Sequence, residues 1–285
     1  MLLKVPFPPT IARLVSSSLG GPSVRDRADR LHFADAGHGY DRFGQHPDFV
    51  AMGDAVVAPL HRRYFRVQSY DAHHIPKTGA AILAANHSGT LPMDGAMLWA
   101  DVLRQTDPPR AARTVADYFV TSLPVISTLF ARCGVVGGSR GNARALLQAG
   151  ELLIIFPEGT PGIGKPYRDR YQLQQWRVGH CELAIRYRAP VVPIAIIGAE
   201  EQMPQLARIP MPRAVPFPYL PVPATPFPLP VRYHIHYGEP LRLDREYTPD
   251  QADDPDIVRR AAERVRDRVQ AMIDAGLAQR TSVFR

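Results

Sequence analysis

A histidine and an aspartate that could act as an acid–base pair occur in residues 86–95, Asn-His-Ser-Gly-Thr-Leu-Pro-Met-Asp-Gly. The stretch follows an apolar run and precedes helical spacing, which predicts that His87 lies at the end of a strand, where parallel sheets place their sites. A loop turning back through Gly89 and Pro92 could bring the Asp94 carboxylate to the imidazole, which could then take a proton from a hydroxyl. Alternatively, Asp94 only caps the helix that follows.

A second candidate is a loop rich in glycine and proline at residues 156–168, Phe-Pro-Glu-Gly-Thr-Pro-Gly-Ile-Gly-Lys-Pro-Tyr-Arg. It also follows an apolar run, and its glycines predict exposed backbone N–H groups. With the positive charges of Lys165 and Arg168, such a loop can hold a phosphate. The spacing of an ATP-binding P-loop is absent, and a simple turn is the alternative.

A third candidate is residues 137–141, Gly-Gly-Ser-Arg-Gly, which fit the G-x-S-x-G pattern of a serine hydrolase. Ser139 would then be a nucleophile on a strand–turn–helix elbow. Its partners, in the chain order of such hydrolases, would be an aspartate and then a histidine: Asp169 or Asp244, and His180, His234 or His236. Alternatively, Ser139 caps a helix and Arg140 binds an anion.

Short apolar runs alternate with segments of helical periodicity along most of the chain. The spacing predicts strands at 64–69, 80–85, 135–136, 152–156, 191–197 and 231–237, and helices at 47–62, 94–106, 123–132, 140–149, 177–188 and 255–277. This alternation predicts an α/β domain over residues 46–285, with a mostly parallel central sheet flanked by helices. Residues 1–45 lack sustained periodicity and are expected to form an N-terminal arm that packs loosely or drapes over the domain.

Residues 204–230 hold ten prolines interleaved with large apolar side chains. Proline at this density excludes a helix and a central strand. A polyproline linker is one interpretation, although linkers are usually polar. The apolar side chains favour a segment that covers a hydrophobic groove or contacts a lipid interface.

The composition favours an anionic partner without identifying it. The chain has 285 residues, 29 prolines and a net charge of +7, and only Lys4, Lys77 and Lys165 among its basic residues are lysine. An arginine excess suits phosphate recognition, but it is equally compatible with a biased base composition.

The stretches of apolar residues are shorter than the roughly 18 that a spanning helix needs, so membrane contact would be at the surface. The two cysteines lack metal-ligand spacing, which argues against a zinc site or a disulfide framework and predicts a reducing compartment.

Together these blocks resemble the glycerolipid and lysophospholipid acyltransferases related to bacterial 1-acylglycerol-3-phosphate acyltransferase. The resemblance covers about residues 60–245 and includes the Asn-His…Asp block, Gly134 to Arg140, Phe-Pro-Glu-Gly-Thr at 156–160 and the strand at 191–196. It implies that His87 is the general base and that Asp94 orients it. It also implies a set of substrate-binding residues, with Arg140 on the acceptor's phosphate: Arg140, Glu158, Gly159, Thr160, Lys165 and Arg168.

One departure concerns the loop between the histidine and the aspartate. Six residues separate His87 from Asp94, where the family usually has four. The longer form is similar to a branch that includes monoacylglycerol acyltransferases and their bacterial relatives. Lys-Pro-Tyr-Arg at 165–168, Ile-Gly-Ala-Glu-Glu at 197–201 and the proline-rich insert are also similar to that branch. The resemblance therefore defines the reaction more closely than the acceptor.

The resemblance predicts acyl transfer from acyl-CoA or acyl-carrier protein to a hydroxyl of a glycerolipid, foremost lysophosphatidic acid, in phospholipid biosynthesis. Glycerol 3-phosphate and neutral mono- or diacylglycerol are alternative acceptors. No metal or cofactor and no nucleic acid is expected, and the protein is expected in the cytoplasm, peripherally on the inner face of the plasma membrane. A serine esterase using Ser139 and a non-catalytic lipid-surface module are the alternatives from other classes.

Overall fold

The computed structural model describes residues 8–117, 120, 125–211 and 219–284. Its centre is a seven-stranded sheet with the order β1-β9-β6-β2-β5-β3-β4. All neighbouring strands run parallel except β9, which is antiparallel to β6. The strands are β1 Gln68–Tyr70, β2 Ala81–Ala85, β3 Arg113–Ala116, β4 Val136–Gly137, β5 Leu152–Ile155, β6 Val191–Ile197 and β9 His234–Tyr237.

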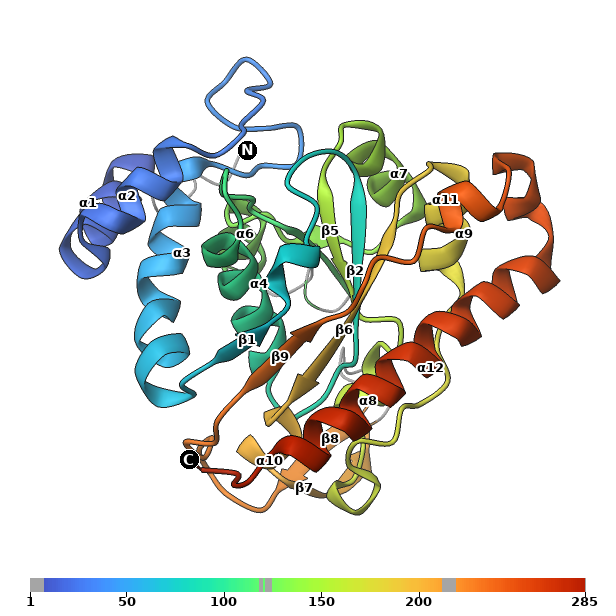
Figure 1. The fold of residues 1–285 in the computed structure, drawn as a ribbon. Coiled ribbons are helices and arrows are strands. Elements are labelled where there is room, and N and C mark those ends of the chain that lie inside the picture. The colour runs from blue at the N-terminus through green and yellow to red at the C-terminus, as the bar shows by residue number, and fades with distance from the viewer. Residues whose placement is uncertain (1–7, 118–119, 121–124, 212–218, 285) are drawn as a thin grey trace.

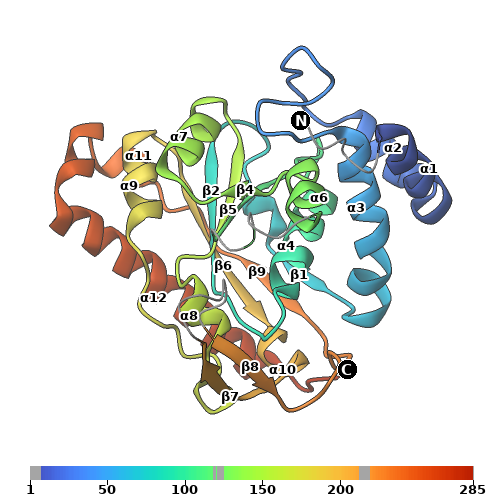
Figure 2. The same cartoon turned by 180° about the vertical axis from the view of Figure 1, so that it is seen from behind.

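Helices cover both faces of this sheet, so the predicted α/β class is confirmed (Figure 1). Seen from behind, α3, α4 and α6 lie to one side of the sheet, and α7, α9 and α12 lie to the other (Figure 2). The helices are α1 Pro9–Gly20, α2 Pro22–Asp29, α3 Pro47–Pro59, α4 Met93–Gln105, α6 Ile126–Arg132, α7 Arg140–Gln148, α8 Thr160–Ile163, α9 Gly179–Arg186, α10 Ala199–Gln202, α11 Leu243–Glu246 and α12 Pro255–Gln279.

The core forms two layers because the central strands are buried on both faces. Along β2, Ile82 and Ala84 pack with α7, α9 and α12, whereas Leu83 and Ala85 pack with α4. Side chains that alternate between two buried faces require apolar residues at every position. This explains why β2, β5 and β6 read as continuous apolar runs in the sequence.

The predicted site residues lie at one edge of the sheet. In the register, Ala84 pairs with Ile155 of β5 and Ala85 pairs with Ile194 of β6, and both pairings are parallel. The carboxyl ends of these strands therefore point the same way, toward the edge where α/β sheets bind ligands. The segments after β2, β5 and β6 meet there.

The N-terminal segment is not the loosely packed arm that the sequence analysis expected. Helix α2 packs on α3 through a small cluster of Val24, Ala28, Ala51 and Ala55, and α1 also packs on α3. Ion pairs reinforce the contact: Arg25 lies 2.5 Å from Asp48, and Arg27 lies 3.0 Å from Asp54. Both carboxylates are buried, so they need these cations. The domain boundary at residue 45 stays a prediction.

The proline-rich insert forms a separate hairpin. Strands β7 Gln205–Pro210 and β8 Tyr219–Pro223 pair antiparallel in a two-stranded sheet, and residues 212–218 between them lie outside the described residues. The prediction that this insert holds neither a helix nor a central strand is confirmed for its described part. Within the described chain, no helix is both long enough and apolar enough to cross a membrane.

Candidate active site

The position of His87 is set by the residue before it. Asn86 directly follows β2, and its amide makes two bonds to the main chain of Ile196 in β6: Oδ1 accepts from the N–H at 2.7 Å, and Nδ2 donates to the carbonyl at 2.9 Å. Asn86 is fully buried. A buried amide with both ends satisfied holds the backbone in one place, so His87 enters the site from a rigid strand end.

Asp94 meets His87 as the sequence predicted. The carboxylate is buried in the first turn of α4, and its Oδ2 lies 2.7 Å from Nδ1 of the imidazole. The same oxygen accepts from the Ser88 N–H at 2.9 Å, and Oδ1 accepts from the Gly95 N–H at 2.8 Å. An ionised carboxylate can only accept, so Nδ1 carries the proton and Nε2 keeps its lone pair.

The imidazole is fixed but remains accessible. Its ring stacks on Phe156 with centroids 4.2 Å apart, and its side chain is 11% exposed. Nε2 forms no hydrogen bond to any residue that the structure describes. The second loop also approaches the main chain of His87. A Cβ at Gly162 would lie 2.7 Å from the His87 carbonyl oxygen, so the loop can come this close only with glycine at this position. The result is an oriented base with one open nitrogen.

The long loop between the pair packs against α10. Gly89 has φ +88°, and a Cβ there would come within 2.7 Å of the Ala199 carbonyl oxygen. The Gln202 amide donates to the Leu91 carbonyl at 3.0 Å, and the Thr90 hydroxyl donates to the Met203 carbonyl at 3.1 Å. These bonds accommodate the two extra residues without separating the acid–base pair.

The second loop supports His87 through Glu158, which is buried. One carboxylate oxygen accepts from the His87 main-chain N–H at 3.1 Å, and the other accepts from the Gln174 N–H at 2.8 Å. Gly159 has φ +59° and leads into α8, where the Thr160 hydroxyl donates to Asp117 at 3.0 Å. Glu158 is thus bonded to the protein's own backbone, and its predicted contact with the acceptor stays untested.

Lys165 is buried and paired with two carboxylates, which the phosphate interpretation did not expect. Its side chain is 2% exposed, with Nζ 3.1 Å from Glu200 and 3.7 Å from Glu158. Burial raises the pKa of Glu200 to about 7. Glu200 was missed as a site residue, although it belongs to an acidic pair directly after an apolar strand. That position could have identified it, because a carboxylate at a buried strand end needs a partner.

The two predicted phosphate-binding arginines lie at the surface. The Arg140 side chain is 85% exposed and lies 3.3 Å from Glu182. The Arg168 side chain is 83% exposed and lies 3.7 Å from Asp169. Of the three predicted phosphate ligands, Lys165 is buried, and only the two arginine side chains are exposed to solvent.

The serine hydrolase alternative does not fit the geometry. Ser139 caps α7, its Oγ accepting from the Asn142 N–H at 3.1 Å, which confirms the capping alternative. Within the described residues no histidine bonds to Ser139. The proposed partners contact other residues: His180 bonds the Arg177 carbonyl, His234 bonds Tyr70, and His236 stacks on Tyr70. Asp169 pairs with Arg168, and Asp244 pairs with Arg242. Burial also lowers the pKa of His180 to about 4.

Comparison with known proteins agrees with this geometry. A family model described as Acyltransferase matches residues 66–197. An uncharacterized protein of Mycobacterium tuberculosis is 35% identical over 291 residues, covering 97% of this chain and 78% of the relative. A protein of Bos taurus named DGAT1/2-independent enzyme synthesizing storage lipids is 26% identical over 212 residues, covering 72% of this chain and 59% of that protein. The chain belongs to the acyltransferase family that this model describes.

A solved acyltransferase has the same fold. The crystal structure of the 1-acyl-sn-glycerophosphate acyltransferase PlsC from Thermotoga maritima matches with a TM-score of 0.53 at 16% identity, over 96% of this chain and 97% of that one. This likeness concerns the fold alone. In the acyltransferase described here, the family match includes His87, Asp94 and Glu158, the residues that the structure brings together.

Proposed function

We propose that this acyltransferase moves a fatty acyl chain from a thioester, acyl-CoA or acyl-carrier protein, to a hydroxyl of a glycerolipid. The observation that carries the proposal is the His87 ring, whose Nδ1 is held by the buried Asp94 carboxylate while Nε2 stays open. A base so oriented can take the proton of a hydroxyl as its oxygen attacks the thioester carbonyl. The C–S bond then breaks, and the leaving thiolate takes the proton from the imidazolium, which returns His87 to its neutral form. No metal or cofactor takes part in these steps.

Lysophosphatidic acid is the acceptor that we propose first. Arg140 and Arg168 could meet its phosphate, because both guanidinium groups reach solvent, while Glu158, Gly159 and Thr160 would shape the acceptor site. Neutral mono- or diacylglycerol is the second candidate. The burial of Lys165 between two carboxylates favours it, since this leaves fewer cations for a phosphate. The Bos taurus relative, named for storage-lipid synthesis, points the same way. Glycerol 3-phosphate is a third acceptor to test.

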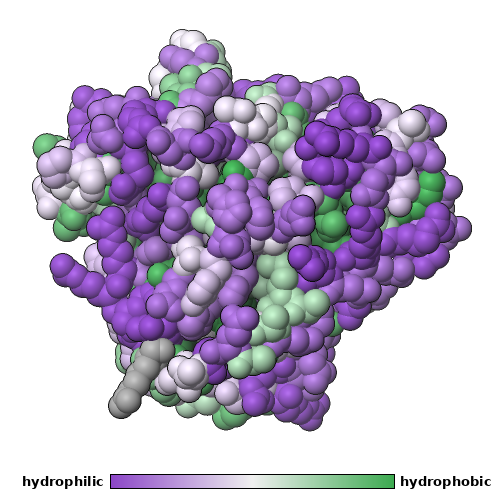
Figure 3. Space-filling view, viewed as in Figure 1, coloured by the Kyte–Doolittle hydropathy of each residue, from purple (hydrophilic) through white to green (hydrophobic). Residues whose placement is uncertain are grey.

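We also propose that the protein binds the inner face of the plasma membrane peripherally, where a glycerolipid acceptor would reside. The hairpin exposes Leu206, Ile209 and Leu220, and Phe227 just beyond it is 77% exposed. Figure 3 shows apolar surface at the lower end of the molecule, where β7 and β8 lie in Figure 1. The hairpin adjoins the second loop, because the Gln205 amide donates to the Gly164 carbonyl at 2.8 Å. Lipid contact there would bring an acceptor close to the site.

Replacing the base should abolish the reaction, and replacing the serine should not. His87→Ala is expected to lower kcat for transfer by about 10²–10⁴-fold, the usual contribution of a general base. Ser139→Ala should keep most of the activity and lose only about 1 kcal/mol of stability with the helix cap. The measurement is product formation from a radiolabelled acyl thioester with each candidate acceptor. Activity lost in Ser139→Ala but kept in His87→Ala would instead support the hydrolase.

The acceptor assay should separate phosphorylated from neutral substrates. If Arg140 binds a phosphate, Arg140→Ala should raise KM for lysophosphatidic acid by about 10-fold, because a charge-assisted hydrogen bond contributes roughly 1.5–3 kcal/mol. KM for monoacylglycerol should not change. Arg144→Ala is the matched control, since Arg144 is another exposed arginine of α7 that bonds only within its helix. If KM for lysophosphatidic acid is the same in Arg140→Ala as in the wild type, Arg140 does not bind the phosphate.

Membrane binding should depend on the hairpin and on salt. We expect the protein to sediment with vesicles that contain anionic phosphatidylglycerol, and less so at high ionic strength, which screens the positive net charge. The variant Leu206→Ser/Ile209→Ser/Leu220→Ser should bind more weakly. Leu14→Ser/Leu19→Ser, on the exposed side of α1, tests the N-terminal segment in parallel. If the fraction of protein that sediments with vesicles changes neither with salt nor in either variant, the proposed contact is contradicted.

A further inference from the structure

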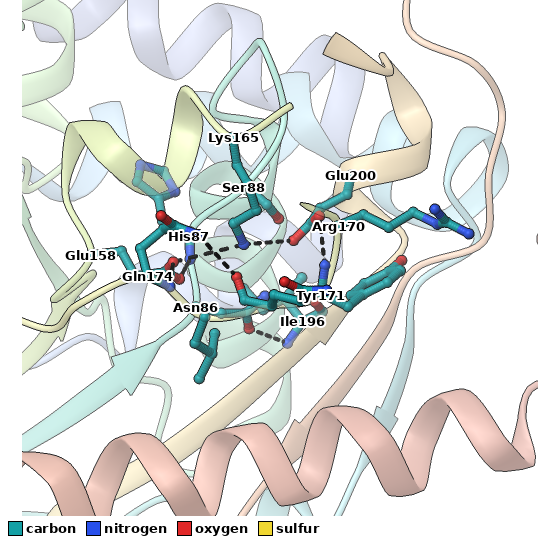
Figure 4. A network of polar contacts seen from close by, with 12 residues as sticks. Asn86, His87, Ser88, Glu158, Lys165, Arg170, Tyr171, Gln174, Ile196 and Glu200 are labelled. Atoms are coloured by element: carbon teal, nitrogen blue, oxygen red, sulfur yellow. Dashed lines mark hydrogen bonds and ion pairs between the residues drawn. The ribbon is translucent and has the colours of Figure 1, made fainter. Parts of the chain in front are cut away.

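Three charged side chains are buried together behind the catalytic histidine. Glu158, Lys165 and Glu200 come from the loop after β5 and from α10 after β6, and each is at most 7% exposed. Their formal charges sum to −1. Figure 4 shows Lys165 reaching between the two carboxylates, with His87 beside Glu158. Buried charges at this density are costly unless each is compensated, so the cluster requires a role.

Glu158 links the cluster to the reacting residue. Its carboxylate accepts the main-chain N–H of His87 at 3.1 Å and that of Gln174 at 2.8 Å. It therefore bonds the backbone of His87 to the irregular segment at 172–177. The ring of His87 is held by Asp94 and its backbone is held by Glu158, so both halves of the residue depend on a buried carboxylate.

Lys165 places a positive charge beside Glu158. Nζ lies 3.7 Å from Glu158 Oε2 and 3.1 Å from Glu200 Oε1, and the second Glu200 oxygen accepts from the Tyr171 N–H at 2.8 Å. Burial raises the pKa of Glu200 to about 7. Without the ammonium, two buried carboxylates would repel each other in a medium of low polarity, and Glu158 would move away from the His87 N–H.

We infer that Lys165 is a positioning residue for acyl transfer: with Glu200 it holds Glu158 against the backbone of His87, and it does not bind the acceptor. This inference rests on the proposed function. Lys165 should therefore act on the rate of the chemical step, because a small displacement of the base is costly to catalysis. A ligand of the acceptor's phosphate would instead act on KM.

The test is Lys165→Met, assayed with acyl-CoA and with both lysophosphatidic acid and monoacylglycerol. We expect kcat to fall by about 10- to 100-fold while KM for either acceptor stays within about 3-fold. Lys77→Met is the matched control, because Lys77 is an exposed lysine of the same chain and should leave both constants unchanged. Thermal unfolding of each variant gives the folded fraction by which rates are normalised.

A second variant separates charge compensation from general damage. Lys165→Met/Glu200→Gln removes one cation and one anion, so the cluster keeps its net charge of −1. We expect kcat of this double variant to be several-fold higher than kcat of Lys165→Met. We also expect the double variant to fold even if the single variant does not. Glu200→Gln alone should lower kcat less than Lys165→Met does, because Lys165 stays paired with Glu158.

Several outcomes would overturn the inference. A rise in KM for lysophosphatidic acid at unchanged kcat in Lys165→Met would make Lys165 a phosphate ligand. A double variant that is folded but no more active than Lys165→Met would exclude charge compensation. Unchanged constants in every variant would leave the cluster without a catalytic role. Failure of the proposed function can be told apart from failure of this inference, because in the first case the wild type itself would show no transfer from the thioester.

Discussion

The hydrogen bond between the Asp94 carboxylate and the His87 ring is the interaction on which the site depends. Asp94 is fully buried and satisfies three donors at once: the imidazole Nδ1–H and the N–H groups of Ser88 and Gly95. Because a carboxylate has no donor of its own, this arrangement permits one tautomer of the imidazole, with the lone pair on Nε2. The same carboxylate would stabilise the imidazolium as it forms.

The rest of the fold supplies rigid attachments for this pair, and α10 is where they converge. Its consecutive side chains Glu200, Glu201 and Gln202 are all buried, and each holds a different segment. Glu200 bonds Lys165 of the second loop, Glu201 pairs with Arg280 at 2.6 Å just beyond the end of α12, and Gln202 donates to the Leu91 carbonyl of the loop between His87 and Asp94. The end of β6 thus connects both site loops to the C-terminal helix.

Much of this could be predicted from sequence, since buried parallel strands are apolar at every position and the motif residues follow them directly. Strand β3 was missed because it is short and begins with Arg113, a fully buried residue whose guanidinium pairs with Asp41. Helices α1 and α2 were missed because alanines and ion pairs, rather than a periodic apolar stripe, hold them to α3. The burial of Lys165 was missed because its partner Glu200 is 35 positions away and only the folded sheet edge brings them together.

The central claim, that His87 acts as a base whose tautomer Asp94 fixes, is tested most directly by steady-state kinetics of Asp94→Asn. An amide is nearly isosteric, but either of its orientations places an NH₂ group against an N–H that the carboxylate now accepts. If the NH₂ group faces the ring, it forces the proton onto Nε2. The account predicts that kcat for acyl transfer falls by about 10²–10⁴-fold while KM stays close to the wild-type value. The buried contact between two donors should also lower the unfolding temperature, so kcat is measured where the variant is folded. A folded Asp94→Asn variant whose kcat stays within about 3-fold of the wild-type value would contradict it.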